Sequence, residues 1–218
     1  MRSKLLKIIL ITFFFSNLTL NYSYSDEFEF TAKDLEVLNK DLIIGKNGAK
    51  IISKNQIITA EKFRYKKTNL HLELKGNVKI IDNLNNIIIN ADRIDYYKQE
   101  EKLLSEGNVK IIDNLNNTII NSDKIEYYKK DGKILSNGFA QIKYNDTYFI
   151  DSQNLTYFLI KKHFFSKNKT TFKDKMGNTF ELDNFDYFEL KDQLRGKNLK
   201  FTDTQSNKYY IDDAMINL

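Results

Sequence analysis

Apolar and polar residues alternate with a period of two along most of the chain. In residues 72–80, 103–111 and 134–142 one parity is mostly apolar and the other is mostly polar. Alternation of this kind is typical of β-strands with one buried face. Helical periodicity is weak and occurs only around residues 33–38. The pattern therefore predicts an all-β chain of long antiparallel strands.

These strands belong to a repeat of about 31 residues. The segment GNVKIIDNLNNIIINADRIDYY begins at Gly76 and returns almost unchanged from Gly107. Looser copies begin at Gly138 and surround Ala60. A unit of this size cannot bury its apolar face alone and must stack on its neighbours. We therefore expect the repeats to form the core.

Each copy contains a turn and then a shift of parity. The motif DNLNN, at residues 82–86 and 113–117, favours a turn because Asn and Asp tolerate left-handed backbone. In the strand that follows, the apolar positions shift by one residue between Ala91 and Ile94. Such a shift would turn side chains to the wrong face unless the strand bulged or turned a corner at residues 92–93. Each copy is therefore predicted to bend from one sheet into another.

Glycine stands on the inward parity at the start of three copies, at Gly76, Gly107 and Gly138. A bend or bulge explains a glycine in a strand, and so does the close approach of a facing strand or a ligand. We favour the bend. After residue 158 the repeat weakens, but residues 170–190 and 195–218 still predict two more hairpins.

The first 25 residues have the layout of a secretory signal peptide. Three basic residues stand near the start, and an apolar run follows at residues 8–15. The small residues Ser23 and Ser25 stand at the two positions that a signal peptidase recognises. A retained membrane anchor is the alternative, but the run is shorter than the ~20 residues of a span. We predict cleavage after Ser25 and one domain over residues 26–218.

Charge and composition limit the possible partners. The formal net charge is +5, and removing the three basic residues of the leader lowers it to +2. A value so near neutral argues against a nucleic-acid-binding protein that depends on clustered Lys and Arg. Residues 161–169, KKHFFSKNK, mix basic and aromatic side chains as single-strand binders do, but we favour a solvated turn there. The chain has no Cys, which excludes disulfides and thiol nucleophiles.

Residues with catalytic or metal-binding potential are few. The two histidines, His71 and His163, have no acidic partner at a recognisable spacing, so surface positions or satisfied hydrogen bonds are expected for them. The DNLNN motif suggests a calcium loop, but Leu84 and Leu115 stand where an oxygen ligand belongs. No Gly-rich phosphate loop is present. We therefore expect no enzyme activity, no cofactor and no metal.

The repeat unit L-x-S/L-x-G-N-V-x-I, turn, I-x-A-D-x-I-x-Y resembles the OstA-like family of lipopolysaccharide transport proteins. That family includes the periplasmic bridge protein LptA and the N-terminal periplasmic domain of the outer-membrane protein LptD. The matching residues are 74–80, 89–96, 103–111 and 120–127, with weaker matches at 49–65 and 138–157. The resemblance implies a V-shaped β-jellyroll in the periplasm, associated with the outer membrane if the chain is of the LptD type.

The resemblance also implies that lipid acyl chains lie in an apolar groove between the sheets. Burying an acyl chain is worth ~0.8 kcal/mol per methylene, so a dozen carbons would face a cost of roughly 10 kcal/mol in water. The inward aliphatic residues of the repeat are the candidate lining, with ordinary core packing as the alternative for each. They are Leu74, Val78, Ile80, Ile89, Ile94, Val109, Ile111, Ile120, Ile125 and Ile142.

Members of the family join head to tail through their terminal strands, since an unpaired edge strand can pair with another chain. The candidate edges here are EFEFTA, with Phe28 and Phe30, and the final KYYIDDAMINL, with Tyr209 and Ile211. The implied partners are lipopolysaccharide, other jellyrolls of the transport system and, for an LptD-type chain, an outer-membrane β-barrel. Nucleic acid is not among them.

Two alternatives stay open at the level of sequence. The residues from 170 onward resemble the continuing repeats of LptD more than the tail of a bridge protein, but no barrel follows and the cysteines of many LptD proteins are missing. The chain is then either a truncated or split LptD-type product or a bridge protein with an extended jellyroll, and we favour the first. A rival of another class is a secreted β-solenoid, structural or adhesive and without lipid cargo. A solenoid stacks its coils in parallel, whereas a jellyroll pairs its strands antiparallel.

Overall fold

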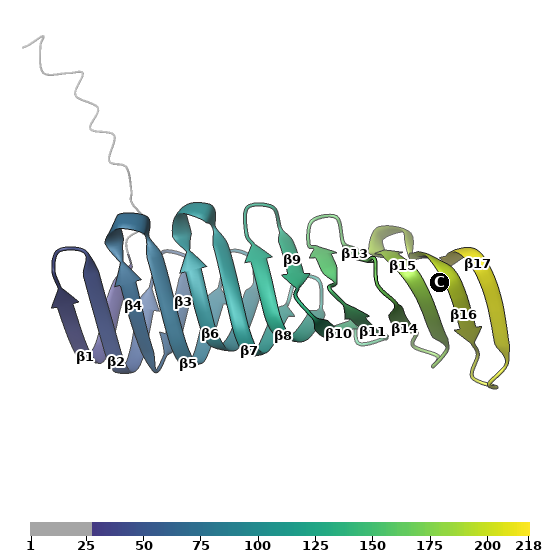
Figure 1. The fold of residues 1–218 in the computed structure, drawn as a ribbon, viewed down its shortest axis with the longest axis horizontal. Helices are drawn as coiled ribbons and strands as arrows, with labels where there is room; N and C mark the ends of the chain where they lie inside the picture. The colour runs from purple at the N-terminus through teal and green to yellow at the C-terminus, as the bar shows by residue number, and fades with distance from the viewer. Residues whose placement is uncertain (1–27) are drawn as a thin grey trace, which may run out of the picture.

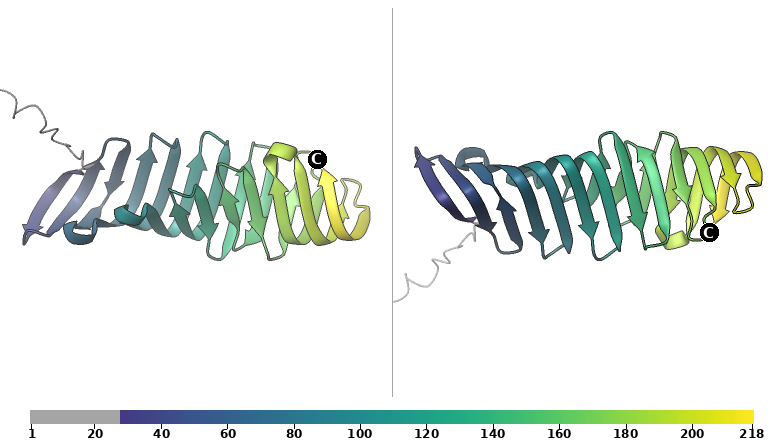
Figure 2. Two further views of the ribbon diagram at one scale, coloured as in Figure 1. Left: turned by 90° about the horizontal axis from the view of Figure 1, so that it is seen from above. Right: turned by 90° about the horizontal axis from the view of Figure 1, so that it is seen from below.

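The computed structural model describes residues 28–218, so the signal-peptide prediction for residues 1–25 lies outside the described part. The described residues form seventeen β-strands and three short 3-10 helices. The strands follow one another along the long axis, from β1 at one end to β17 at the other (Figure 1). In Figure 2 the same order runs from the purple N-terminal strands to the yellow C-terminal strands in both views.

The bounds of the elements are as follows. The first nine strands are β1 (Glu29–Leu38), β2 (Leu42–Ile52), β3 (Gln56–Ala60), β4 (Lys62–Lys66), β5 (His71–Asp82), β6 (Ile87–Tyr97), β7 (Lys102–Asp113), β8 (Thr118–Tyr128) and β9 (Lys133–Ser136). The others are β10 (Phe139–Tyr144), β11 (Tyr148–Gln153), β12 (Thr156–Phe158), β13 (His163–Ser166), β14 (Thr170–Lys173), β15 (Thr179–Phe188), β16 (Gln193–Thr202) and β17 (Lys208–Asn217). The 3-10 helices are η1 (Lys67–Asn69), η2 (Lys98–Glu100) and η3 (Glu189–Lys191).

Every strand pair among residues 28–218 is antiparallel. The all-β, antiparallel prediction is therefore confirmed, and the parallel β-solenoid is ruled out. The two C-terminal hairpins are also present, as β14–β15 and β16–β17. The weak helical pattern at residues 33–38 was misleading, because pairing with β2 holds these residues in β1.

The long strands cross between two layers. In β5, residues 71–75 pair with β4, whereas residues 79–82 pair with β3. We call the layer that contains β4, β9, β12 and β13 layer 1, and the layer that contains β3, β10, β11 and β14 layer 2. The register shifts at the crossing, between Lys75 and Val78 in β5 and between Asn90 and Arg93 in β6. The predicted corner near residues 92–93 is therefore confirmed.

A glycine and an asparagine form the corner in each of the two closest copies. Gly76 and Gly107 have φ angles of +79° and +76°, and Asn77 and Asn108 have φ angles of 45° and 48°. Glycine adopts this left-handed region readily and Asn tolerates it. A Cβ on Gly76 would also collide with the side chain of Glu61. The bend, rather than the approach of a ligand, therefore explains these glycines.

Turns form the long side opposite these corners, which we call the mouth. Layer 1 ends there in η1, η2, the turns at residues 129–132 and 159–162, and η3, while layer 2 ends in turns such as residues 83–86 and 114–117. Neighbouring turns are joined by backbone bonds, for example from Lys129 N to Glu101 O at 2.9 Å. The predicted DNLNN turns are thus present. Residues 161–169 are only partly a turn, because His163–Ser166 forms β13.

One cluster of buried apolar side chains fills the space between the layers, from Ala49 in β2 to Leu199 in β16. Within each layer most of its members occupy alternate positions along a strand, as Val109 and Ile111 do in β7. Within residues 28–218 no helix has the length and apolar character of a membrane span. The assignment of residues 26–218 to one domain stays a prediction.

Candidate functional site

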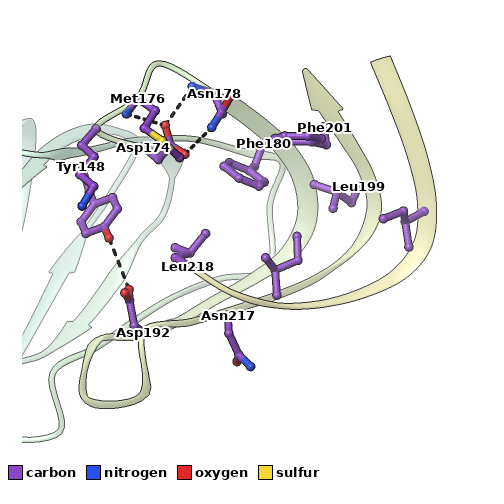
Figure 3. Close-up of a pocket in the computed structure, with 13 residues that line it drawn as sticks. Tyr148, Asp174, Met176, Asn178, Phe180, Asp192, Leu199, Phe201, Asn217 and Leu218 are labelled. Carbon is purple, nitrogen blue, oxygen red and sulfur yellow. Dashed lines mark hydrogen bonds between the residues drawn. The ribbon is translucent and has the colours of Figure 1, made fainter. Parts of the chain in front are cut away.

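The interior opens at the C-terminal end of the two layers. A cavity of about 350 Å³ lies there, at the lower end of the range of roughly 300–1,000 Å³ that is usual for small-molecule pockets. Figure 3 shows Tyr148 and Asp192 on one side of the cavity, Phe180 and Phe201 on the other, and Leu218 between them. The apolar part of the lining consists of Phe180, Leu199, Phe201, Ile211, Ile216 and Leu218.

This cavity exists because the array of strands ends at β17. Among the described residues β17 pairs only with β16, so no further strand covers its inward side chains. Leu199 on β16 is buried, whereas Ile211, its cross-strand partner on β17, is 44% exposed. An inward residue in the middle of the array has a strand on both sides. The same alternating pattern therefore gives a filled core in the middle and an apolar cavity at the end.

Polar groups at the rim of the cavity are hydrogen-bonded. Asp174 accepts bonds from the backbone N–H groups of Met176 and Asn178, each at 2.9 Å, and from the side-chain amide of Asn178 at 2.8 Å. Asp192 Oδ1 accepts a bond from the hydroxyl of Tyr187 at 2.9 Å and a longer one from Tyr148 at 3.5 Å. The rim can therefore stay ordered beside an apolar guest.

Burial and the carboxylate of Asp192 raise the pKa of both rim tyrosines, Tyr148 and Tyr187, above the ordinary value. Desolvation favours the neutral phenol, and a nearby negative charge disfavours a second one. Both hydroxyls therefore stay protonated and remain donors. The rim offers hydrogen-bond donors to Asp192 rather than a reactive base.

A row of tyrosines from layer 1 lines the inside of the mouth. Strand pairing places them at equivalent positions on every second strand, and they are Tyr65, Tyr96, Tyr127, Tyr157 and Tyr187. Burial first, and then the carboxylates of Asp82 and Asp113, raise the pKa of Tyr127. Burial and Asp113 act on the pKa of Tyr157 in the same way. The tyrosine row of layer 1 therefore lies close to the carboxylates at the ends of layer 2.

An ion pair connects the two layers across the mouth. Lys129 Nζ, in a layer 1 turn, lies 2.8 Å from Asp82 Oδ2 at the end of β5, and the two side chains are only 15% and 3% exposed. Gln56 and Asn85 also donate to Asp82, each at 3.1 Å. Burial opposes the charge of Asp82, yet the bonds from Lys129 and Asn85 outweigh it and lower the pKa of Asp82. This pair holds the mouth shut in the middle of the protein.

The ten aliphatic residues predicted to line a groove all lie in this middle part, within the buried cluster. Each of them is at most 2% exposed, and none lines the C-terminal cavity. They face one another between the layers, so the structure brings the set together. Burial is what core packing requires and also what lipid contact in an opened interior would require. Their contact with lipid therefore stays a prediction.

The four residues predicted at partner edges lie at the two ends of the array. β1 pairs only with β2, and β17 only with β16, within the described chain. The rings of Phe28 and Phe30 turn inward, however, and Phe30 stacks on Phe63 with 5.0 Å between ring centroids. Ile211 lines the cavity and Tyr209 is 49% exposed on the last strand. Pairing of these edges with another chain stays a prediction.

The cavity residues Phe180, Leu199 and Phe201 were not predicted. Their alternation is visible in TFEL and NLKF, but the repeat that marks the earlier copies is lost after residue 158. The partners of both histidines were not predicted either. His71 Nε2 lies 2.9 Å from Asp95 Oδ1, and His163 Nε2 lies 2.7 Å from Asp186 Oδ1. These pairs cross between neighbouring strands, so only the strand register reveals them.

Metal-binding and family signals are weak or absent. Within the described part of the chain no group of three or more His, Cys, Asp or Glu side chains could hold a metal ion. No protein-family model matches the sequence, and no curated protein matches it significantly.

Among solved structures, the chain is similar to LptH from Pseudomonas aeruginosa, described as the LptA homologous periplasmic component of the conserved lipopolysaccharide transport device. The TM-score is 0.43 with 12% sequence identity, over 47% of this chain and 76% of that chain. The likeness concerns the arrangement of the strands alone.

Proposed function

We propose that the protein is a component of periplasmic lipopolysaccharide transport that shields lipid acyl chains between its two layers. The observation that supports this function is the apolar cavity at the C-terminal end, whose lining includes Phe180 and Leu199 of the buried core. A hydrocarbon chain that enters it leaves water and gains ~0.8 kcal/mol per buried methylene. The polar groups at the rim would remain hydrogen-bonded while the chain enters.

Transfer along the protein would require the middle to open. The ten predicted groove residues fill that space, and the ion pair between Lys129 and Asp82 spans its mouth. Breaking a buried pair of this kind is costly, so the closed middle would be the resting state. An acyl chain bound at the C-terminal cavity would then move inward as the layers separate.

Neighbouring jellyrolls would extend the path at both ends. β1 and β17 each present one unpaired edge within the described residues, and such edges are suited to pairing with another strand. We propose that other proteins of the transport system bind there. A chain without residues 208–218 should lose its C-terminal partner in a pull-down experiment. Unchanged affinity of that variant would contradict the role of this edge.

The strands β14–β17 continue the array past the repeats. This extension favours an LptD-type domain over a bridge protein. Such a domain should co-purify from cells with an outer-membrane β-barrel, whereas a bridge protein should co-purify with soluble jellyrolls at both ends. Cell fractionation would test the periplasmic location at the same time.

Site-specific photocrosslinking tests the function itself. A photoreactive residue at Phe201, in the cavity, should form adducts with lipopolysaccharide in cells that export it, and one at Ile111 or Ile120 should do so during active export. The matched control is Phe149, which is 45% exposed on the outer side of layer 2 and should give no adduct. Absence of lipid adducts at all three interior positions during export would overturn the proposal.

A further inference from the structure

The tips of the mouth turns carry exposed apolar side chains from both layers. Leu84, Leu115 and Met176 stand on layer 2 turns, and Ile160 and Leu190 stand on layer 1 turns. Their exposed fractions lie between 66% and 82%. We call these five residues the apolar tips. Other strongly exposed apolar residues, such as Val37 and Met215, belong to the edge strands β1 and β17.

The apolar tips face each other across the mouth instead of being scattered over the surface. Leu115 of layer 2 and Ile160 of layer 1 both line a second cavity of about 330 Å³. Asp113 and Tyr127 also belong to its lining. Met176 lines the C-terminal cavity together with Asp192, the residue that follows η3. Three of the five tips, Leu115, Ile160 and Met176, therefore border openings that lead toward the interior.

The turns that carry Met176 and Leu190 turn a carboxylate inward and a lysine outward. Asp174 is buried and bonded within its own turn, while the adjoining Lys175 is exposed. Glu189 accepts a bond from Lys162 at 2.8 Å, while Lys191 is exposed. The outward charge of these turns is therefore positive although their composition is mixed.

The same sorting holds in the neighbouring turns. Lys161 stands exposed beside Ile160, and Lys130 is exposed in the preceding turn. The exposed acids of the mouth turns are Glu100, Glu101, Asp131 and Asp146, and Asp146 is paired with Lys143 at 2.8 Å. The exposed lysines of these turns are more numerous and include Lys54, Lys67, Lys130, Lys161, Lys175 and Lys191. Lysine thus predominates over unpaired carboxylate around the apolar tips.

We propose that the mouth binds the surface of an anionic lipid bilayer, with the apolar tips inserted at the boundary of headgroups and acyl chains. Apolar side chains flanked by lysines are the combination that interfacial binding requires, since the lysines attract anionic headgroups while the apolar groups leave water. The tips are separated by polar Asn residues such as Asn83 and Asn116. A fluid bilayer can receive separated tips, whereas a protein partner would need a contiguous apolar centre.

This inference goes beyond the proposed function, because it concerns the outer rim of the mouth and needs no lipid inside. It would place the openings of the interior against the lipid surface from which a chain could be taken or to which it could be delivered.

Vesicle co-flotation tests the proposal. The chain from residue 26 onward should bind phosphatidylcholine vesicles weakly and vesicles that also contain phosphatidylglycerol about tenfold more strongly. The double variant Leu115→Asn with Ile160→Asn should lower binding to the anionic vesicles by about tenfold. The control is Phe139→Asn with Phe149→Asn, two exposed apolar residues on layer 2 strands away from the mouth, and it should bind as the unaltered chain does.

A charge variant separates the attraction of the lysines to anionic headgroups from the insertion of the apolar tips. Lys161→Glu with Lys191→Glu should remove the preference for anionic vesicles, whereas Lys79→Glu with Lys110→Glu, on layer 2 strands, should keep most of it. Equal binding to neutral and anionic vesicles would overturn the proposal. Unchanged binding of the tip variant to anionic vesicles would also overturn it. So would binding through the mouth that occurs only with a protein partner and not with vesicles.

A fluorescent fatty acid in solution, without vesicles, keeps this test distinct from that of the proposed function. The tip variant should bind the fatty acid as the unaltered chain does, because neither of its two residues lines the C-terminal cavity. A Phe201→Asp variant should lose the fatty acid and still bind vesicles. Circular dichroism and thermal unfolding show that each variant is folded before binding is compared.

Discussion

The middle of the protein and its C-terminal end are built from the same alternating strands, yet inward residues of the last strands line a cavity, whereas the ten aliphatic groove candidates of the middle are enclosed. Leu103 in the middle and Leu199 at the end are both inward and both 1% exposed. Both lie on strands that are paired on two sides, but the strand next to Leu199 is the last one, and Leu199 borders the cavity there. The position of a residue in the array, and not its type, therefore decides whether it is core or lining.

The two regions also differ at the mouth. In the middle, Lys129 and Asp82 join the layers with a buried ion pair. At the end, Asp192 accepts hydrogen bonds from the hydroxyls of Tyr187 and Tyr148. The carboxylate there is bound by neutral donors instead of by a lysine. The middle is therefore held shut more strongly than the end, and this difference can be measured.

The largest expected effect is the loss of core packing in the middle. Leu103→Ala should lower the free energy of unfolding by about 3–5 kcal/mol, because its neighbours enclose the new void. Leu199→Ala should cost less, about 2–3 kcal/mol, because the side chain already borders a cavity. Urea unfolding measures both values. Equal losses would show that the C-terminal cavity is not open in solution.

The second effect concerns the ion pair across the mouth. Lys129→Met should cost about 3 kcal/mol, since it leaves Asp82 buried without its cation. The double variant with Asp82→Asn should recover part of that loss. The control is Lys124→Met, which removes the partner of Glu106 from a pair that is 46% exposed on both sides, and it should change stability little. Hydrogen exchange should rise in β5 and β8 of Lys129→Met only.

A third effect is the acid sensitivity of the middle. The hydroxyl of Tyr128 first, and then Asn137 and Lys102, lower the pKa of Glu126 from 4.5 to about 2 against the effect of burial. Because the folded value is depressed, this stabilisation is fully present above pH 4.5 and is lost as the pH falls toward 2. It amounts to at most about 3 kcal/mol.

Glu126→Gln should therefore flatten the fall of unfolding free energy between pH 4.5 and 2. Thermal unfolding across that range measures it. An unchanged pH profile in the variant would mean that other carboxylates account for the acid sensitivity of the protein.

The smallest expected effect is the difference in stability between alanine substitutions at two corners. Gly76 and Gly138 both have positive φ angles, +79° and +107°, so alanine should be strained at each by about 1 kcal/mol. A Cβ at Gly76 would also displace Glu61, whereas nothing lies within 4 Å of one at Gly138. Gly76→Ala should therefore be the more destabilising of the two. The reverse order in urea unfolding would mean that the corner geometry differs from that described.

Much of the fold could be predicted from the sequence because its signals are local. The period of two identified the strands, the DNLNN motif located the turns, and the parity shift near Asp92 located the corner. The spacing of Tyr96 and Tyr127 could also have indicated the tyrosine row. The acid partners of His71 and His163 could not be found, because each lies on a neighbouring strand 23 or 24 residues away and depends on the register.

The sequence by itself determined the strands, their turns, their inward faces and the corners that fold them into two layers, because each of these depends on residues close together in the chain. Only the tertiary structure decided which inward residues are enclosed and which border a cavity. That depends on whether a further strand lies alongside, and on which charges meet across the mouth. Lys129 and Asp82 are 47 residues apart in the chain, and only the stacking of successive strands brings them together.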